Sequence, residues 1–235
     1  AALVNAYVDA GLPSGVLNLV FGVPSDISEY LIAHPVIRKI SFTGSTPVGK
    51  RLAALAGSHM KRVTMELGGH APALVFEDAD VKQAAKLLSA AKFRNAGQVC
   101  VSPTRFMVHE RVYDDFVEQF TAAAKALVVG DGLDEATQMG PLANLRRVEA
   151  MDALVSDAVQ RGARIRTGGR RLRNDGFFFQ PTVLTDVPLD WRIMNEERCG
   201  PVVPIASFST CEDAMVEANR LPCGLAAYAY TKSAA

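Results

Sequence analysis

Apolar side chains recur along this chain with two different periods. Spacings of three to four residues predict helices over 1–12, 25–34, 47–56, 81–95, 110–128, 145–161 and 211–220. Short apolar runs between Gly, Pro or polar residues predict strands over 17–21, 38–42, 62–67, 73–76, 105–109, 202–208 and 226–231, and an extended segment over 181–184. Because helices and strands alternate, the pattern predicts an α/β fold with a parallel sheet.

The same pattern restarts after the glycine pair at positions 68–69, so we expect a second α/β layer to begin there. In the first layer, Thr46 is the expected N-cap of the helix over 47–56, and Pro47 lies in its first turn. In the second layer, a loop rich in Gly and Arg is expected over 168–176.

Length and composition narrow the class of protein. A chain of 235 residues with 49% hydrophobic and 21% charged residues can bury a sizeable core, which argues against disorder. Lys plus Arg equals Asp plus Glu at 25 each, so we expect a small neutral or anionic substrate and neither nucleic acid nor membrane as partner. No apolar run approaches the roughly 18 to 20 residues that cross a bilayer, and no signal peptide is evident, so the expected location is cytoplasmic.

Cysteines and histidines show no metal-binding pattern. There are four of each, without a C-x-x-C pair and without paired histidine spacing. We therefore expect reduced thiols and no metal site.

One thiol and one carboxylate stand in settings that suit covalent catalysis. Cys100 follows the helix over 81–95 and is expected on a loop, where a thiolate can attack a carbonyl carbon. Glu66 ends an apolar strand before two glycines, and partial burial there would raise its pKa so that it could take a proton from water. The structural alternatives are a small buried hydrophobe for Cys100 and a solvated or salt-bridged edge residue for Glu66.

Glu-Leu-Gly-Gly at positions 66–69 and Phe-Arg-Asn-Ala-Gly-Gln-Val-Cys at 93–100 closely resemble, in order and separation, the aldehyde dehydrogenase superfamily. The stretches over 42–50 and 195–202 resemble cofactor-contacting segments of that family, and the resemblance covers nearly the whole chain. It implies oxidation of an aldehyde to a carboxylic acid with NAD or NADP, with Cys100 as nucleophile and Glu66 as general base. The stretch over 95–103 looks most like members that act on semialdehydes of dicarboxylic acids.

The resemblance also implies where a dinucleotide binds. Gly44, Ser45 and Gly49 lie where a strand joins a helix N-terminus, which attracts phosphate, and the family holds the pyrophosphate there. Leu67 belongs to the same implied set of cofactor contacts. An ordinary capped helix is the alternative. A P-loop reading of 44–50 fails because Arg51 replaces the Ser or Thr that binds magnesium, and the G-x-G-x-x-G fingerprint is absent.

Glu197 resembles the family glutamate that hydrogen-bonds the nicotinamide ribose, although it could also be a solvated loop acid. Cys199 departs from the family pattern, because an aromatic residue usually stands there. By the same resemblance, residues 1–68 would be the end of a Rossmann-like cofactor domain. Residues 69–235 would be the thiol-bearing catalytic domain.

Two other functions stay open: a noncatalytic dinucleotide-binding or assembly module, and acyl transfer to coenzyme A, which Glu66 disfavours because it offers a base for hydrolysis. Family members form homodimers or homotetramers and continue beyond both ends of this chain. We therefore expect a central fragment without the upstream oxyanion-hole Asn, the Lys at the adenosine ribose or the C-terminal oligomerisation strand. His70 and Arg105 are assigned no catalytic role.

Overall fold

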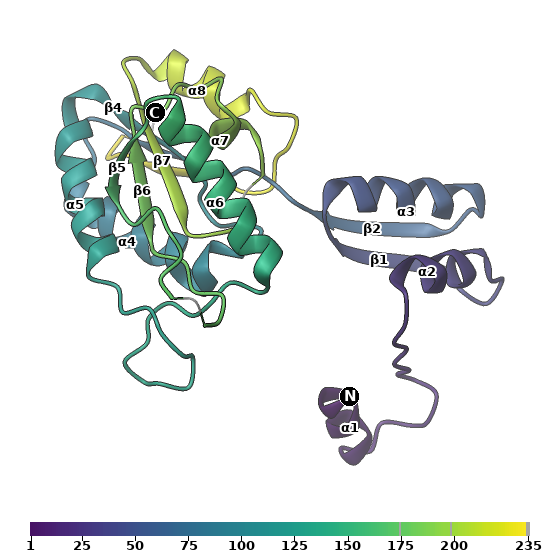
Figure 1. Ribbon diagram of the computed structural model, residues 1–235. Helices are drawn as coiled ribbons and strands as arrows, with labels where there is room; N and C mark the ends of the chain where they lie inside the picture. The colour runs from purple at the N-terminus through teal and green to yellow at the C-terminus, as the bar shows by residue number, and fades with distance from the viewer. Residues whose placement is uncertain (174, 198, 234–235) are drawn as a thin grey trace. The chain divides into compact units, whose positions relative to one another are not determined.

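The computed structural model describes residues 1–173, 175–197 and 199–233 (Figure 1). The chain divides into two compact units, Ala1–Leu67 and Gly68–Ala235. Both contain helices and parallel strands, so the predicted α/β class is confirmed.

The first unit pairs two parallel strands. Its elements are α1 (Ala2–Asp9), α2 (Pro24–Ala33), β1 (Lys39–Gly44), α3 (Thr46–Ser58) and β2 (Arg62–Leu67). In the register of β1 and β2, Thr43 lies opposite Glu66 and Gly44 lies opposite Leu67. The sheet therefore brings the end of the Glu66 strand beside the turn that leads into α3.

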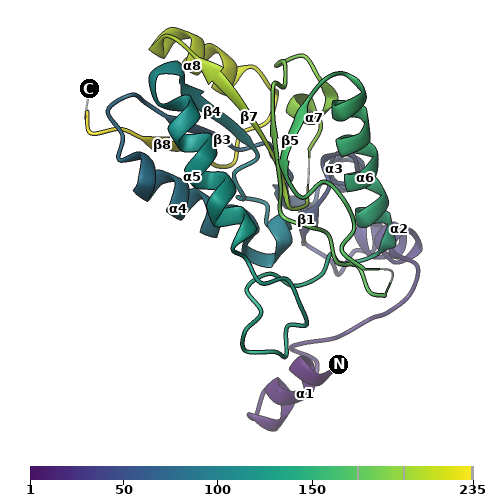
Figure 2. The same cartoon turned by 60° about the vertical axis from the view of Figure 1, so that its left-hand side comes forward.

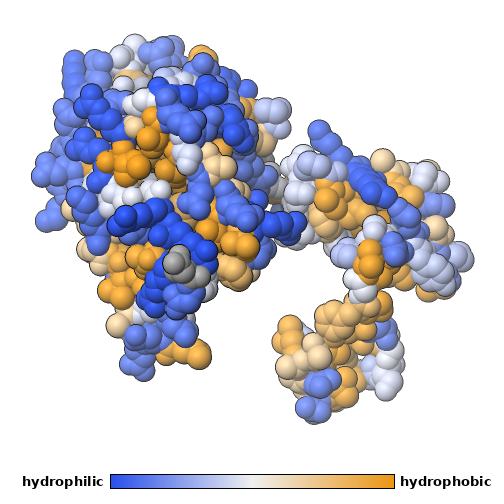
Figure 3. Space-filling view, in the orientation of Figure 1, coloured by the Kyte–Doolittle hydropathy of each residue, from blue (hydrophilic) through white to orange (hydrophobic). Residues whose placement is uncertain are grey.

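The strand expected over 17–21 is wrong. Within residues 1–67 these positions form no strand, and β1 and β2 are the strands that pair. Val20 and Phe21 keep 62% and 79% of their surface exposed. Figure 3 shows apolar surface gathered over the N-terminal segment. A short apolar run becomes a strand when a neighbour accepts its hydrogen bonds, and this unit supplies none.

The start of α3 also differs from expectation. Ser45, with extended backbone angles, is the N-cap, whereas Thr46 is already helical, and Pro47 lies in the first turn as predicted. The Ser45 side chain makes no capping hydrogen bond. The first amides of α3 are thus left without a side-chain acceptor from the cap residue.

The second unit is built around a six-stranded sheet among its described residues (Figures 1 and 2). The strands are β3 (Pro72–Val75), β4 (Arg105–His109), β5 (Arg164–Thr167), β6 (Thr182–Thr185), β7 (Val202–Phe208) and β8 (Tyr228–Tyr230). Their order is β5-β6-β7-β4-β3-β8, and all neighbours are parallel except β5, which is antiparallel to β6. The expected parallel sheet is therefore correct apart from one edge strand.

Helices cover both faces of this sheet. They are α4 (Val81–Phe93), α5 (Tyr113–Lys125), α6 (Leu145–Gln160), α7 (Arg192–Asn195) and α8 (Cys211–Asn219). The larger core joins β-strand residues such as Val75 and Phe106 to Leu88 of α4 and Phe120 of α5. A smaller cluster on the other face packs Leu74 and Met107 under Ala214 of α8, and Figure 2 shows α4 and α5 on the side away from α8.

The periodicity missed strand β5 and the short helix α7, and it placed the start of α5 too early. β5 was not predicted, because Arg164 and Arg166 interrupt its apolar pattern and its residues are largely exposed at the sheet edge. The helix expected over 110–128 begins as a 3₁₀ turn, Glu110–Val112, and becomes α-helical at Tyr113. Only α7 borders a segment that carries candidate chemistry, because it ends two residues before Glu197.

Candidate active site

The first unit gathers four of the expected cofactor residues around the turn between β1 and α3. Gly44 ends β1, Ser45 caps α3, and Gly49 is buried in the first turns of that helix. A Cβ atom on Gly49 would lie 2.3 Å from Cδ2 of Leu67, so α3 packs directly on the Leu67 side chain. The absence of a side chain at position 49 lets the helix N-terminus approach the end of β2.

An apolar pocket of about 620 Å³ lies beside this turn in the first unit. It is lined by residues of the 20–22 loop and of α2, β1 and α3, among them Phe21, Pro24, Ile27, Phe42, Val48 and Leu52. Arg51 and Glu29 also line it and form an ion pair with each other. A mostly apolar pocket next to an anion-attracting helix N-terminus suits a flat heterocycle that carries phosphate.

Glu66 is the next-to-last residue of β2, and Thr43 is its neighbour on β1. Its side chain is exposed, so the expected partial burial of this carboxylate is wrong for the first unit. Strand β2 alternates exposed and partly buried positions near its end, and Glu66 occupies an exposed one while Leu67 turns inward against α3.

In the second unit, three expected site segments meet at one edge of the sheet. Residues 68–71 lead into β3, residues 98–104 lead into β4, and residues 199–201, which follow Glu197 closely in the chain, lead into β7. These strands are parallel neighbours in the order β7-β4-β3, so their amino ends lie side by side. The fold thereby brings the glycine pair, Cys100 and Glu197 to the same edge.

Cys100 is exposed on a tight turn. The amide of Ser102 donates to the carbonyl of Val99 at 2.9 Å, which closes the turn around Cys100. Gln98 fixes the turn from one side, because its Oε1 accepts from the Ala143 amide at 2.8 Å and its Nε2 donates to the Asn95 carbonyl at 3.1 Å. The thiol therefore stands on an anchored loop open to solvent, and it is not a buried hydrophobe.

The backbone before this turn is left-handed at three consecutive residues, Asn95, Ala96 and Gly97, with φ of 51°, 54° and 73°. A Cβ on Gly97 would lie 2.4 Å from the carbonyl oxygen of Gly200. The cysteine loop and the Glu197 segment are thus in backbone contact, which glycine at position 97 permits.

The Glu197 carboxylate packs against Gly68. A Cβ on Gly68 would lie 2.1 Å from both carboxylate oxygens. The residue keeps much of its surface, but the carboxyl end is the packed part, and this desolvation raises the pKa of Glu197 while the positive charge of Arg147 acts to lower it. The segment after the Glu66 strand and the expected ribose-binding acid are therefore in direct contact.

Cys199 is half-buried beside this carboxylate. Its Sγ donates to Oε1 of Glu197 at 3.9 Å, a weak hydrogen bond. Burial raises the pKa of the Cys199 thiol, and the Glu197 charge raises it further. Arg198, between these two residues in the expected cofactor segment, lies outside the described residues.

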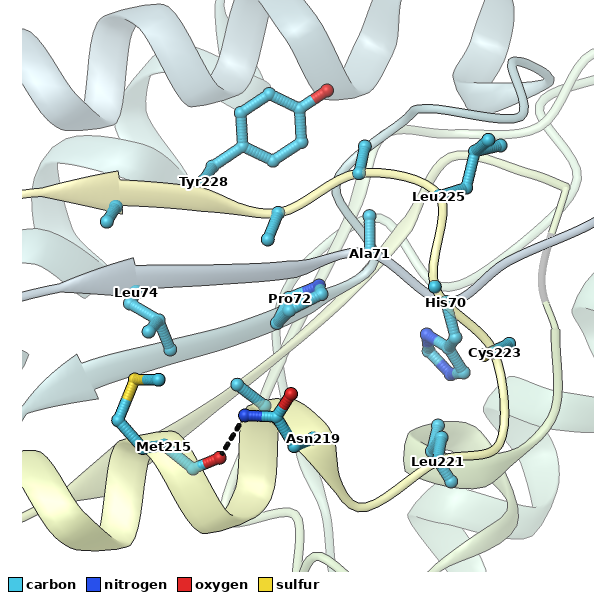
Figure 4. A pocket seen from close by; sticks show the side chains of 15 residues that line it. His70, Ala71, Pro72, Leu74, Met215, Asn219, Leu221, Cys223, Leu225 and Tyr228 are labelled. Atoms are coloured by element: carbon cyan, nitrogen blue, oxygen red, sulfur yellow. Dashed lines mark hydrogen bonds between the residues drawn. The ribbon is translucent and has the colours of Figure 1, made fainter.

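A second pocket of about 520 Å³ lies in the same unit on the α8 side of the sheet (Figure 4). Figure 4 shows His70 facing the loop of Leu221 and Cys223, with Leu74 and Met215 farther along the pocket. Neither Cys100 nor Glu197 lines it. The pocket therefore adjoins that edge at His70 and Ala71 but contains neither of these two candidate reactive groups.

Sequence reasoning missed the apolar pocket of the first unit and the anchoring of Gln98. The Gly-Gln pair before Cys100 was the available signal for the anchor, whereas the pocket joins side chains from four segments. Among residues 1–173, 175–197 and 199–233, no three His, Cys, Asp or Glu side chains form a group that could hold a metal ion. Within that same part of the chain, no helix is both long and apolar enough to span a membrane.

Comparison with known proteins identifies the chain by family. The model of the aldehyde dehydrogenase family matches residues 1–235. A putative 4-(hydroxymethyl)benzenesulfonate dehydrogenase of Comamonas testosteroni is 49% identical over 99% of this chain and 49% of its own length. A probable NADP⁺ succinate-semialdehyde dehydrogenase of Sinorhizobium fredii is 47% identical over 95% of this chain and 46% of its own length.

Among solved structures, a succinate-semialdehyde dehydrogenase from Burkholderia pseudomallei superposes with a TM-score of 0.97 at 42% identity. That match covers 99% of this chain and 48% of the other. The chain therefore spans about half the length of the relatives that it matches. It belongs to the aldehyde dehydrogenase family.

Proposed function

We propose that the full-length protein oxidises an aldehyde to a carboxylic acid with NAD or NADP, with Cys100 as nucleophile. The observation that supports this most is the exposed thiol of Cys100 on an anchored turn, at the same sheet edge as Glu197. The named relatives are dehydrogenases, one of them for NADP⁺, which favours the same chemistry.

The residues present fit a dinucleotide. The N-terminus of α3 offers amides without a side-chain cap to a pyrophosphate at Gly44 and Ser45, and the adjacent apolar pocket suits adenine. The Glu197 carboxylate, packed on Gly68, is an acceptor for ribose hydroxyls. When bound, the nicotinamide supplies a two-electron acceptor. Titration of the protein with NAD and with NADP in separate experiments distinguishes the two cofactors.

Cys100 carries the first half of the reaction. Its thiolate sulfur forms a bond to the aldehyde carbon, and the carbonyl π electrons move to oxygen. In this proposal the backbone N–H of Cys100 donates a hydrogen bond to that oxyanion. One such hydrogen bond typically lowers the activation free energy by about 3 to 4 kcal/mol. The C=O bond then re-forms, the C–H electron pair leaves as hydride, and the aldehyde carbon is oxidised to a thioester.

Glu66 carries the second half. Its carboxylate takes a proton from water, and the hydroxide oxygen bonds to the thioester carbon. The C–S bond breaks, the electron pair returns to the Cys100 sulfur, and a carboxylic acid is released. An exposed carboxylate such as Glu66 can exchange its proton with solvent after each turnover.

The substrate is proposed to be an aldehyde that carries an anionic group, such as a dicarboxylic semialdehyde. The names of the two curated relatives contain a sulfonate and a succinate semialdehyde, and both compounds are anions. Arg94, an exposed cation at the end of α4 on the same loop as Cys100, is the side chain proposed to attract that group.

The test is turnover by the full-length protein with succinic semialdehyde and either NAD or NADP, followed by the absorbance of the reduced nicotinamide. Cys100→Ala is expected to lower the rate by about a thousandfold or more. Cys211→Ala, at another exposed cysteine, is the matched control and is expected to keep full rate. Cofactor binding without turnover in the wild type would instead favour the noncatalytic module.

The assembly is proposed to be a homodimer or homotetramer without nucleic acid or membrane partners. Light scattering on the purified full-length protein measures its molar mass, and a monomeric mass would refute the proposed homo-oligomer.

A further inference from the structure

Two arginines and one buried carboxylate form a hydrogen-bond network in the second unit. This network connects the segment that follows Gly68 to the segment that precedes Glu197. Arg105 at the start of β4 donates from Nη1 to Oε1 of Glu217 on α8 at 3.0 Å, and both side chains are buried. Arg220, just after α8, donates from Nε to Oε2 of the same carboxylate at 2.6 Å. We call these three residues, Arg105, Glu217 and Arg220, the Glu217 network.

One end of the Glu217 network holds the segment that follows the glycine pair. Arg105 Nε donates to the carbonyl of His70 at 3.2 Å, and the His70 ring lies 2.7 Å from Oγ1 of Thr104. His70 comes two positions after Gly68. Gly68 is the residue whose Cα faces the Glu197 carboxylate. This end of the network therefore fixes the surface against which Glu197 packs.

The other end holds the segment that precedes Glu197. Arg220 donates from Nη1 to Oδ1 of Asn195, and from Nη2 to the carbonyl of Leu189 at 3.0 Å. Asn195 in turn donates to the carbonyls of Leu189 and Trp191 at 2.9 and 2.6 Å. Asn195 comes two positions before Glu197, so Arg220 fixes the turn from which that carboxylate projects.

We infer that Arg220 is a positioning residue that, through the Glu217 network, holds the Glu197 carboxylate against Gly68. Hydrogen bonds hold both the segment after the glycine pair, at His70, and the segment before Glu197, at Asn195. The position of Glu197 therefore does not depend on the Gly68 contact alone. That this placement serves cofactor binding rests on the proposed function, in which Glu197 contacts the nicotinamide ribose.

The chemistry of the network suits such a role. A guanidinium presents donors in a planar fork, so Arg220 can engage Glu217, Asn195 and the Leu189 carbonyl at once. Lysine carries its donors on a single nitrogen and cannot span these groups in the same way. Arg220 reaches over the surface while Glu217 and Arg105 are buried, so a change at Arg220 leaves the buried ion pair intact.

The experiment compares the full-length wild type with Arg220→Gln, Arg220→Lys and the control Arg111→Gln. Arg111 pairs with Glu77 on the surface and has no contact with the Glu217 network among its hydrogen bonds to described residues. Hydrogen exchange of the backbone over 189–200 and the Kd of NADH and NADPH by fluorescence are measured for each.

For Arg220→Gln we expect faster exchange confined to 189–200 and a Kd raised by about three- to tenfold. The expected kcat at saturating cofactor stays within about twofold, because the reacting groups are untouched. Arg220→Lys should lie between Arg220→Gln and the wild type, and Arg111→Gln should match the wild type.

Unchanged exchange over 189–200, or exchange that rises over the whole unit, would overturn the positioning role. A wild type that binds neither NADH nor NADPH would refute the proposed function instead. In that case, the exchange over 189–200 alone decides whether Arg220 holds the segment.

Discussion

The α-carbon of Gly97 faces the carbonyl oxygen of Gly200, so closely that a Cβ on residue 97 would lie 2.4 Å from that oxygen. The contact joins the loop that carries Cys100 to the segment that carries Glu197. The φ of Gly97 is 73°, a left-handed conformation that side chains disfavour. Both the space and the backbone conformation thus require glycine there.

Gly97→Ala is expected to destabilise the protein by at least about 2 kcal/mol, because it combines a strained φ with a backbone clash. Thermal unfolding measures this loss, and the rate of Cys100 alkylation reports the displaced loop. Gly132→Ala is the matched control, since a Cβ there meets no atom within 4 Å and its φ is not positive. Equal melting temperatures for the two variants would contradict the close approach of Gly97 to Gly200.

Helix α3 contains two glycines, Gly49 and Gly57, that can be compared in the same way. A Cβ on Gly49 would lie 2.3 Å from Cδ2 of Leu67, whereas a Cβ on Gly57 meets no atom within 4 Å. We expect Gly57→Ala to stabilise by about 0.5 to 1 kcal/mol through helix propensity, and Gly49→Ala to destabilise. Urea unfolding gives both values, and a stabilised Gly49→Ala would show that α3 does not need to approach Leu67.

Strand positions that rest on uninterrupted apolar runs could be predicted from the sequence. The observed bounds of β4 and β7 coincide with the predicted ones. All their residues except Ser207 are buried, and both strands have parallel neighbours on both sides. The run over 17–21 has the same local character, yet no strand pairs with it. Pairing is a long-range property, so local periodicity could not separate these cases.

In the candidate site, too, local features could be predicted from the sequence and long-range contacts could not. The Cys100 loop follows from its flanking residues, but its contact with Gly200 depends on the order β7-β4-β3, which no local pattern encodes. The exposure of Glu66 was mispredicted because the apolar residues before it suggested burial. Near the end of β2, exposed and partly buried residues alternate, and Glu66 occupies an exposed position. Residue types indicated the chemistry, and strand order determined which of them meet.

Glu197 is expected to lower the stability of the fold at neutral pH. Its pKa is raised by desolvation, so the folded state favours the protonated acid, and stability falls as pH rises above the unfolded pKa through the folded one. Glu197→Gln should therefore raise the melting temperature more at pH 7 than at about pH 4. Glu196→Gln, at an exposed residue paired with Arg192, is the control. A larger gain at the lower pH would reverse the proposed sign.

The two halves of the proposed reaction separate in a Glu66→Gln variant. The amide cannot take a proton from water, but the attack by Cys100 needs no group from residue 66. We expect a burst of reduced nicotinamide of about one equivalent per site, followed by turnover slowed by about a hundredfold or more. Rapid-mixing absorbance resolves both phases. Loss of the burst together with the turnover would assign Glu66 to the first step rather than to hydrolysis.

Arg94 provides a test of the proposed substrate charge. If its guanidinium attracts the anionic end of the substrate, Arg94→Gln should raise the KM for succinic semialdehyde by about tenfold and leave the KM for an uncharged aldehyde of similar length nearly unchanged. Added salt should reproduce part of the effect in the wild type, because Arg94 is exposed and its field is screened. Arg111→Gln serves as the surface control. An equal rise in KM for both aldehydes would mean that Arg94 supports the loop of Cys100 and does not select a charged substrate.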